Sequence, residues 1–116
     1  EANEAQVLNI IGDVKDKNVI IRDDIVDTAG TVVLGAEALK KQGALDILVC
    51  ATHGVLSGAA IERIQDSPIT EMVITDTILR DIDKLPSKFK ELSTADMFGE
   101  AIRRIHNSDS VSSLFV

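Results

Sequence analysis

The chain is poor in aromatic residues and cysteine. Of its 116 residues, 3 are Phe and none is Trp or Tyr, so we expect a core built from Val, Ile, Leu and Ala. The scarcity of aromatic rings also argues against platforms on which nucleic-acid bases could stack. The single cysteine, Cys50, excludes an internal disulfide and a CxxC metal site, and it fits a reducing compartment.

Clusters of positive charge and long apolar runs are also missing. The formal net charge is -7, and no more than two basic residues are adjacent, so we expect no binding to a nucleic-acid backbone. No apolar run approaches the roughly 18 residues of a membrane span, and no stretch resembles a signal peptide. We therefore expect a cytoplasmic protein that binds neither nucleic acid nor a membrane.

What the sequence does contain is typical of a folded domain. Hydrophobic residues make up 45% of the chain, which is a globular composition rather than a disordered one. The length is enough for one domain with a modest core, and we expect that domain to span residues 1–116. Pro68 and Pro86 are interpreted as loop residues and not as a domain boundary.

Apolar runs alternate with stripes of helical spacing. Continuous or alternating apolar residues predict short strands at 18–22, 45–51, 72–75 and 89–92. Helical spacing predicts helices at 3–11, 32–42, 57–64 and 94–106. This alternation predicts an α/β fold with a mostly parallel sheet and right-handed crossovers.

Details of the predicted helices follow from their end residues and apolar positions. Gly43 is placed to cap the C-terminus of helix 32–42, while the Ser57 and Thr94 side chains are placed to cap the N-termini of the next two. The last helix is predicted to bury one face, formed by Ala95, Met97, Phe98, Ala101, Ile102 and Ile105.

The densest group of polar side chains, Asp-Asp-Ile-Val-Asp-Thr-Ala-Gly-Thr at 23–31, directly follows the first strand. Ligands of open parallel sheets bind beyond the carboxyl ends of strands, where Asp23 and Asp24 are predicted to lie. Ionised carboxylates only accept hydrogen bonds, so sugar hydroxyls, metal ions or metal-bound waters are their natural partners. Neighbouring strand residues point to opposite faces, so the two side chains need not meet one ligand.

The turn after these acids suits a phosphate. Thr28 and Thr31 supply hydroxyl donors, and Gly30 allows close approach of the backbone. The helix that follows offers unpaired N–H groups and a positive dipole end. Taken singly, each residue has a simpler structural explanation. The three Asp residues would be solvated loop acids, and Thr31 would be a helix cap. The block as a whole favours a phosphate cradle with an acidic rim, which matches the polarity of ribose 5-phosphate.

Segment 23–31 resembles the ribose-phosphate-binding motif of the phosphoribosyltransferase fold, a Rossmann-like fold. Its surroundings are more specific and resemble ribose-phosphate pyrophosphokinases. The resemblance covers essentially the whole chain in order, and its further segments are 7–14, 51–58, 75–78, 101–105 and 110–115.

The resemblance implies an enzyme of nucleotide biosynthesis that transfers pyrophosphate from ATP to ribose 5-phosphate with Mg²⁺, as a homo-oligomer that is a hexamer in the family. It implies that Asp23 binds ribose hydroxyls and that Asp24 binds ribose or a water on the metal. The 5-phosphate would lie in the loop formed by Asp27, Thr28, Ala29, Gly30 and Thr31.

In the family, the ATP-binding segments, the metal-binding His and Asp, and the catalytic Lys-Arg loop precede the matched part. We therefore expect this chain to be a C-terminal portion that holds no catalytic residue and no metal ligand. We also expect its domain to lack its first strands, to expose a sheet edge, and to be inactive in isolation.

Two alternatives stay open. One is a non-catalytic regulatory homologue of the synthetase, which would have no chemical need for the intact loop. The other is a phosphoribosyltransferase, which would share little with this chain beyond the loop. Elsewhere we expect Cys50 in the core, His53 in a structural hydrogen bond, and Arg103 and Arg104 in surface or subunit contacts. The segment Thr75-Asp76-Thr77, at another strand end, is a weaker candidate for the border of a nucleotide pocket.

Overall fold

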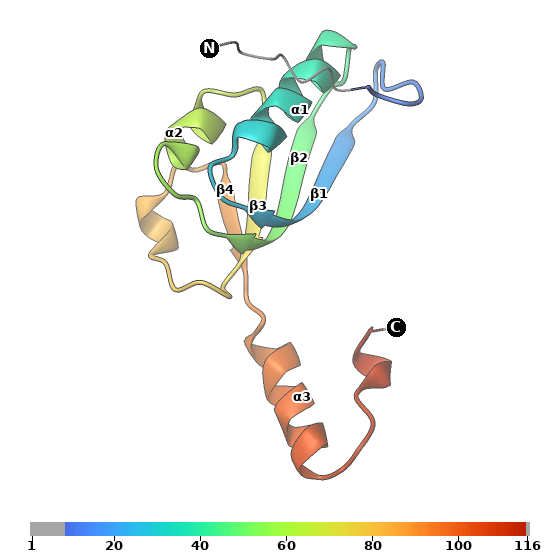
Figure 1. Ribbon diagram of the computed structural model, residues 1–116, viewed down its shortest axis with the longest axis vertical. Coiled ribbons are helices and arrows are strands. Elements are labelled where there is room, and N and C mark those ends of the chain that lie inside the picture. Colours follow the sequence, from blue (N-terminus) through green and yellow to red (C-terminus); the bar gives the residue numbers. More distant parts are fainter. Residues whose placement is uncertain (1–8, 116) are drawn as a thin grey trace, which may run out of the picture.

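The computed structural model describes residues 9–115. They form a four-stranded, fully parallel sheet with the strand order β1-β2-β3-β4 (Figure 1). The predicted α/β fold with a parallel sheet is therefore confirmed. Its elements, in chain order, are β1 (Val19–Val26), α1 (Gly30–Lys41), β2 (Ile47–Gly54), α2 (Ala60–Gln65), β3 (Glu71–Thr75), η1 (Ile82–Lys84), β4 (Phe89–Leu92), α3 (Ala95–His106) and η2 (Ser112–Phe115).

The core lies between the sheet and the two helices α1 and α2, which lie on one side of it (Figure 1). Ile47, Val49 and Ala51 of β2 are buried in this layer, whereas the intervening Leu48 and Cys50 are only half-buried. The core is aliphatic as predicted, with Met72 and Phe89 as additions. Cys50 was predicted in the core but lies on the opposite sheet face, which no helix of residues 9–115 covers.

Strands β1 and β2 extend further than their apolar runs. Backbone pairing between them continues from Val19 with Ile47 to Val26 with Gly54. Asp23 and Asp24 were predicted beyond the strand end, but they lie within β1. The reason is that ladder hydrogen bonds involve the backbone, so polar side chains near a sheet end do not terminate a strand. In the described sheet β1 and β4 are the edge strands.

Helix α1 begins earlier than predicted, so Gly30 and Thr31 belong to its first turn. Its C-terminus has the predicted glycine cap. Gly43 has φ +90, its N–H donates to the Lys40 carbonyl at 3.0 Å, and the Ala44 N–H donates to the Leu39 carbonyl at 3.1 Å. These two bonds form a Schellman motif, which satisfies carbonyls that the helix itself leaves unpaired.

Two N-cap predictions are wrong at the level of the side chain. Helix α2 begins after Ala59, and the Ser57 hydroxyl binds Asp27 instead of the helix end. Helix α3 begins after Thr94 as predicted, but the Thr94 hydroxyl donates to Asp76. The predicted helix 3–11 lies mainly outside the described residues, and its described part, 9–11, is not helical.

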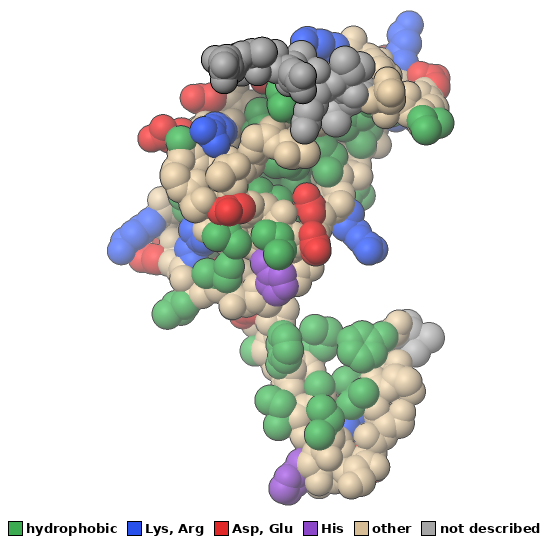
Figure 2. Space-filling view, viewed as in Figure 1, with side chains coloured by type: hydrophobic (Ala, Val, Ile, Leu, Met, Phe, Trp, Pro, Cys, Tyr) green, Lys and Arg blue, Asp and Glu red, His purple; other side chains and the backbone are tan. Residues whose placement is uncertain are grey.

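The last two elements, α3 and η2, form a C-terminal arm (95–115) that projects from the body (9–94) (Figure 1). The predicted burial of the α3 apolar face is wrong, since no residue of α3 is buried and Ile102 and Ile105 are 66% and 68% exposed. Figure 2 shows the hydrophobic side chains gathered on the surface of the arm. The helical spacing specified an apolar face, but it did not specify a surface to cover that face.

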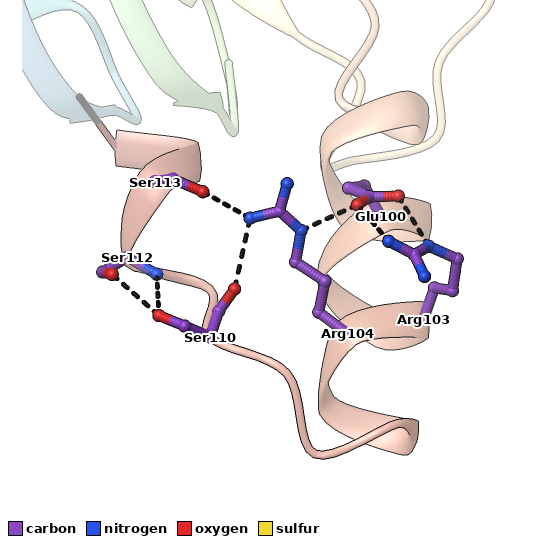
Figure 3. Close-up of polar contacts among 6 residues, drawn as sticks. All are labelled: Glu100, Arg103, Arg104, Ser110, Ser112 and Ser113. Carbon is purple, nitrogen blue, oxygen red and sulfur yellow. Dashed lines mark hydrogen bonds and ion pairs between the residues drawn. The ribbon is translucent and has the colours of Figure 1, made fainter.

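Polar contacts give the arm its shape (Figure 3). Glu100 accepts hydrogen bonds from Arg103, at 2.7 and 3.0 Å, and from Arg104 at 2.7 Å. Arg104 also donates to the Ser110 carbonyl at 3.2 Å and to the Ser113 hydroxyl at 2.5 Å. Bonds from both arginines lower the pKa of Glu100 to about 2. Arg104 thereby joins α3 to η2 and to the segment that leads into it.

Candidate functional site

The connection between β1 and α1 consists of Asp27, Thr28 and Ala29. Ala29 occupies the N-cap position of α1 with φ 64 and ψ 5, a left-handed conformation that residues other than glycine rarely adopt. Its methyl group is nevertheless packed, because the residue is only 5% exposed. This turn redirects the chain from the sheet edge into the helix. Residues 27–31 are called the phosphate loop below.

The N-terminus of α1 is uncapped. Ala29 provides no side-chain cap, and the first turn contains no acidic residue. The first N–H groups of an α-helix have no partner within the helix, and they lie at the positive end of its dipole. The start of α1 therefore presents donors and positive potential that only water or a bound anion can use.

A cavity of about 270 Å³ adjoins this helix end. That volume is near the lower limit of small-molecule sites, which measure roughly 300–1,000 Å³, so it suits a small ligand. Six of the seven predicted binding residues line it, namely Asp23, Asp27, Thr28, Ala29, Gly30 and Thr31. The cavity thus combines carboxylate acceptors with hydroxyl and amide donors.

Asp24, the seventh residue, is not among the residues that line this cavity. It lines a neighbouring one of about 390 Å³ on the open face of the sheet, together with Arg22, Cys50 and Thr52. The neighbouring Asp23 side chain and a 2.9 Å hydrogen bond from the Ile25 N–H lower the pKa of the Asp24 carboxyl. The role of Asp24 toward ribose or a metal-bound water stays a prediction.

Two residues that were not predicted to belong to the site contact the phosphate loop from the segment after β2. The Ser57 hydroxyl donates to the Asp27 carboxylate, and Arg63 Nη1 donates to the Thr28 carbonyl at 2.9 Å. Both contacts join residues 30 or more positions apart in the chain. No local pattern could have revealed them, because they depend on the parallel pairing of β1 with β2.

Polar residues at the C-terminal ends of β2 and β3 make structural contacts. His53 forms the predicted structural hydrogen bond, which joins its Nδ1 and the Thr77 hydroxyl at 2.8 Å. Asp76 accepts bonds from the Ser93 hydroxyl at 2.7 Å and from the N–H and hydroxyl of Thr94 at 2.8 and 2.7 Å. These bonds lower the pKa of Asp76 to about 2. They use its carboxylate to connect β3 to the start of α3.

Two further features bear on the possible ligands. Within residues 9–115, no group of three or more His, Cys, Asp or Glu side chains is arranged to hold a metal ion. Of the helices in the same range, none has the length and apolar character needed to cross a membrane.

The parallel sheet with α1 and α2 packed on one face defines an α/β protein in which an uncapped helix follows the first strand. Comparison with known families is more specific. The chain belongs to the family described as the phosphoribosyl synthetase-associated domain, whose model matches residues 1–116.

The similar curated proteins include ribose-phosphate pyrophosphokinases of bacteria. The chain is 59% identical over 115 residues to that of Caldanaerobacter subterraneus and 54% identical over 116 residues to that of Campylobacter jejuni. These alignments cover 99% and 100% of this chain but only 36% and 37% of the two relatives. The chain thus spans about a third of the length of the curated relatives that it matches.

A similar solved structure supports the same assignment. The phosphoribosylpyrophosphate synthetase of Mycobacterium smegmatis superposes with a TM-score of 0.81 at 36% sequence identity. The match covers 84% of this chain and 33% of that one. The family resemblance and the fold expected from the sequence are therefore confirmed.

Proposed function

We propose that this chain is the ribose-5-phosphate-binding portion of a ribose-phosphate pyrophosphokinase. The complete enzyme would transfer pyrophosphate from ATP to the anomeric hydroxyl of ribose 5-phosphate, giving 5-phosphoribosyl 1-pyrophosphate and AMP for nucleotide biosynthesis. The observation that carries this proposal is the uncapped N-terminus of α1 beside a small cavity that Asp23 and the phosphate loop line. The names of the relatives, which are ribose-phosphate pyrophosphokinases, support this reaction.

The two ends of the ligand would meet different groups. The 5-phosphate would accept hydrogen bonds from the amides at the start of α1 and from the Thr28 and Thr31 hydroxyls, which line the cavity. Asp23 would accept hydrogen bonds from ribose hydroxyls at the opposite side. This arrangement would hold the sugar in one orientation, which is the contribution that positioning makes to phosphoryl transfer.

The described residues do not fit a complete Mg²⁺ site. Asp24 lines a different cavity from Asp27, and within residues 9–115 no three metal-ligating side chains converge. We therefore assign no step of the reaction to a metal held by these residues. Mg²⁺ and ATP are proposed as partners of the complete enzyme, which on family grounds would be a cytoplasmic homo-oligomer.

The regulatory and transferase alternatives are less well supported. The family description, which names a synthetase-associated domain, fits both an enzyme and a non-catalytic partner, but the names of the relatives favour the enzyme. A phosphoribosyltransferase would share only the phosphate loop with this chain. The similarity here extends over the full length of the chain.

Titration of the chain with ribose 5-phosphate, with and without Mg²⁺, tests the proposed site by NMR. The amides of residues 28–31 should shift, and Asp23→Asn should weaken the binding. Asp46→Asn is a matched control, since Asp46 is an exposed acid on the connection into β2, outside the cavity. Undisturbed amides at 28–31 would contradict the proposal.

An activity measurement tests the assignment of this chain to one part of a larger enzyme. We expect the 116 residues alone to release no AMP from ATP and ribose 5-phosphate. Sustained turnover by the isolated chain would contradict that expectation, although it would leave the ribose-5-phosphate site intact.

A further inference from the structure

The segment after β2 binds the phosphate loop along its backbone. The N–H groups of Val55 and Leu56 both donate to the Val26 carbonyl, at 3.0 and 3.2 Å. The Ser57 N–H donates to the Asp27 carbonyl at 3.1 Å. Residues 55–57, called the strap below, therefore follow the chain as it leaves β1 and enters the loop.

The strap has a conformation that its surroundings fix. Leu56 has φ 52, which is unusual for a bulky residue, and it is only 5% exposed. Such a conformation persists only where packing and hydrogen bonds determine it. On its N-terminal side Gly54 packs so closely that an added Cβ would lie 2.8 Å from Cγ2 of Ile74. Burial of Leu56 and the close packing of Gly54 on β3 thus hold the strap in place.

Two side chains extend this contact to the groups that would face the ligand. The Ser57 hydroxyl bonds the Asp27 carboxylate, which fixes the orientation of an acid that lines the cavity. Arg63 Nη1 bonds the Thr28 carbonyl at 2.9 Å. The carbonyl and the following N–H of a planar trans peptide point in opposite directions, so this bond also fixes the direction of the Ala29 N–H.

The charges reinforce this role. Asp23 and Asp27 line a cavity in which we propose a phosphate, and like charges disfavour one another there. None of the residues that line the cavity is basic. Arg63 lies outside the cavity but is hydrogen-bonded directly to the loop, so it brings a positive charge close to it.

We propose that Ser57 and Arg63 are positioning residues for the bound sugar phosphate. Ser57 orients the Asp27 carboxylate, and Arg63 orients the peptide between Thr28 and Ala29 while adding a positive charge behind the loop. This inference rests on the proposed function of the site, because it assumes a sugar phosphate as the ligand.

Binding of ribose 5-phosphate to the 116-residue chain, followed by NMR, tests the inference. Arg63→Ala should raise the dissociation constant about fivefold and Ser57→Ala about threefold, since each removes one hydrogen bond that holds the loop. Arg63→Lys keeps a charged donor and should recover most of the affinity. Glu62→Gln is the matched control, because this exposed neighbour on α2 makes no hydrogen bond to the loop in the described structure.

Thermal unfolding of the same variants separates positioning from folding. Arg63 is exposed, so its replacement should leave the unfolding midpoint within the range of the Glu62→Gln control. Unchanged ribose 5-phosphate affinity in Arg63→Ala, or an affinity loss that Arg63→Lys does not recover, would overturn the inference alone. Absence of binding by the unaltered chain would overturn the proposed function and this inference together.

Discussion

The body (9–94) and the arm (95–115) differ in where their apolar side chains lie. In the body, aliphatic side chains of β2 and β3 are buried against α1 and α2, so apolar burial is the main driving force for folding. In the arm, the apolar side chains are exposed, and α3 is held by Asp76 at its start and by the contacts of Glu100 and Arg104 further along. An amphipathic helix can therefore be specified by local polar contacts without covering its apolar face.

Truncation of a buried side chain in the body should cause the largest loss of stability. Ile47 is fully buried, so Ile47→Ala should lower the free energy of unfolding by about 2–5 kcal/mol through lost burial and a residual cavity. Urea unfolding followed by circular dichroism measures this change. A decrease in the free energy of unfolding as small as that expected for replacing an exposed residue would show that the stability of the body does not depend on its core.

Removal of Asp76 should act on the arm alone. Asp76→Ala deletes the acceptor for the Thr94 N–H and for two hydroxyls, so the first turn of α3 should fray while the sheet is unaffected. Faster amide exchange confined to 95–98 would be the expected NMR result. Asp46→Ala, an exposed acid at the opposite end of the sheet, serves as the control. Equal exchange changes in β2 and β3 would remove the distinction between arm and body.

Lowering the pH should unfold the arm before it unfolds the body. Asp76 and Glu100 have pKa values of about 2, below their ordinary 3.8 and 4.5, because both accept hydrogen bonds as carboxylates. Groups with lowered pKa values stabilise the folded state fully above the ordinary values, and this stabilisation is lost as pH falls toward 2. The α3 amide shifts should thus move toward random-coil values between about pH 4.5 and 2. Constant α3 shifts across this range would contradict the prediction.

The smallest effect should come from the apolar face of the arm. Ile102 is 66% exposed, so Ile102→Ser should change the free energy of unfolding of the chain by less than about 0.5 kcal/mol. The same urea experiment as for Ile47→Ala measures it. A loss comparable to that of the core variant would mean that the arm folds as part of the body.

The sequence predicted those features that local spacing determines. The strand Phe89–Leu92, the glycine cap of α1 and the block of residues 23–31 were all identified from short patterns. Features that depend on distant residues were missed or wrong. The end of β1 depends on its pairing with β2, the Ser57 and Arg63 contacts depend on that same pairing, and the exposure of α3 depends on what lies beside it.

The left-handed Ala29 has a consequence for ligand affinity. A glycine at this position would sample many backbone conformations before a ligand arrives, whereas alanine has far fewer available to it. Because Ala29 is buried in its strained conformation, the turn has already lost this conformational freedom in the unbound protein. If the proposed sugar phosphate binds at the start of α1, it would meet a turn that is already ordered, and its association would lose little backbone entropy there.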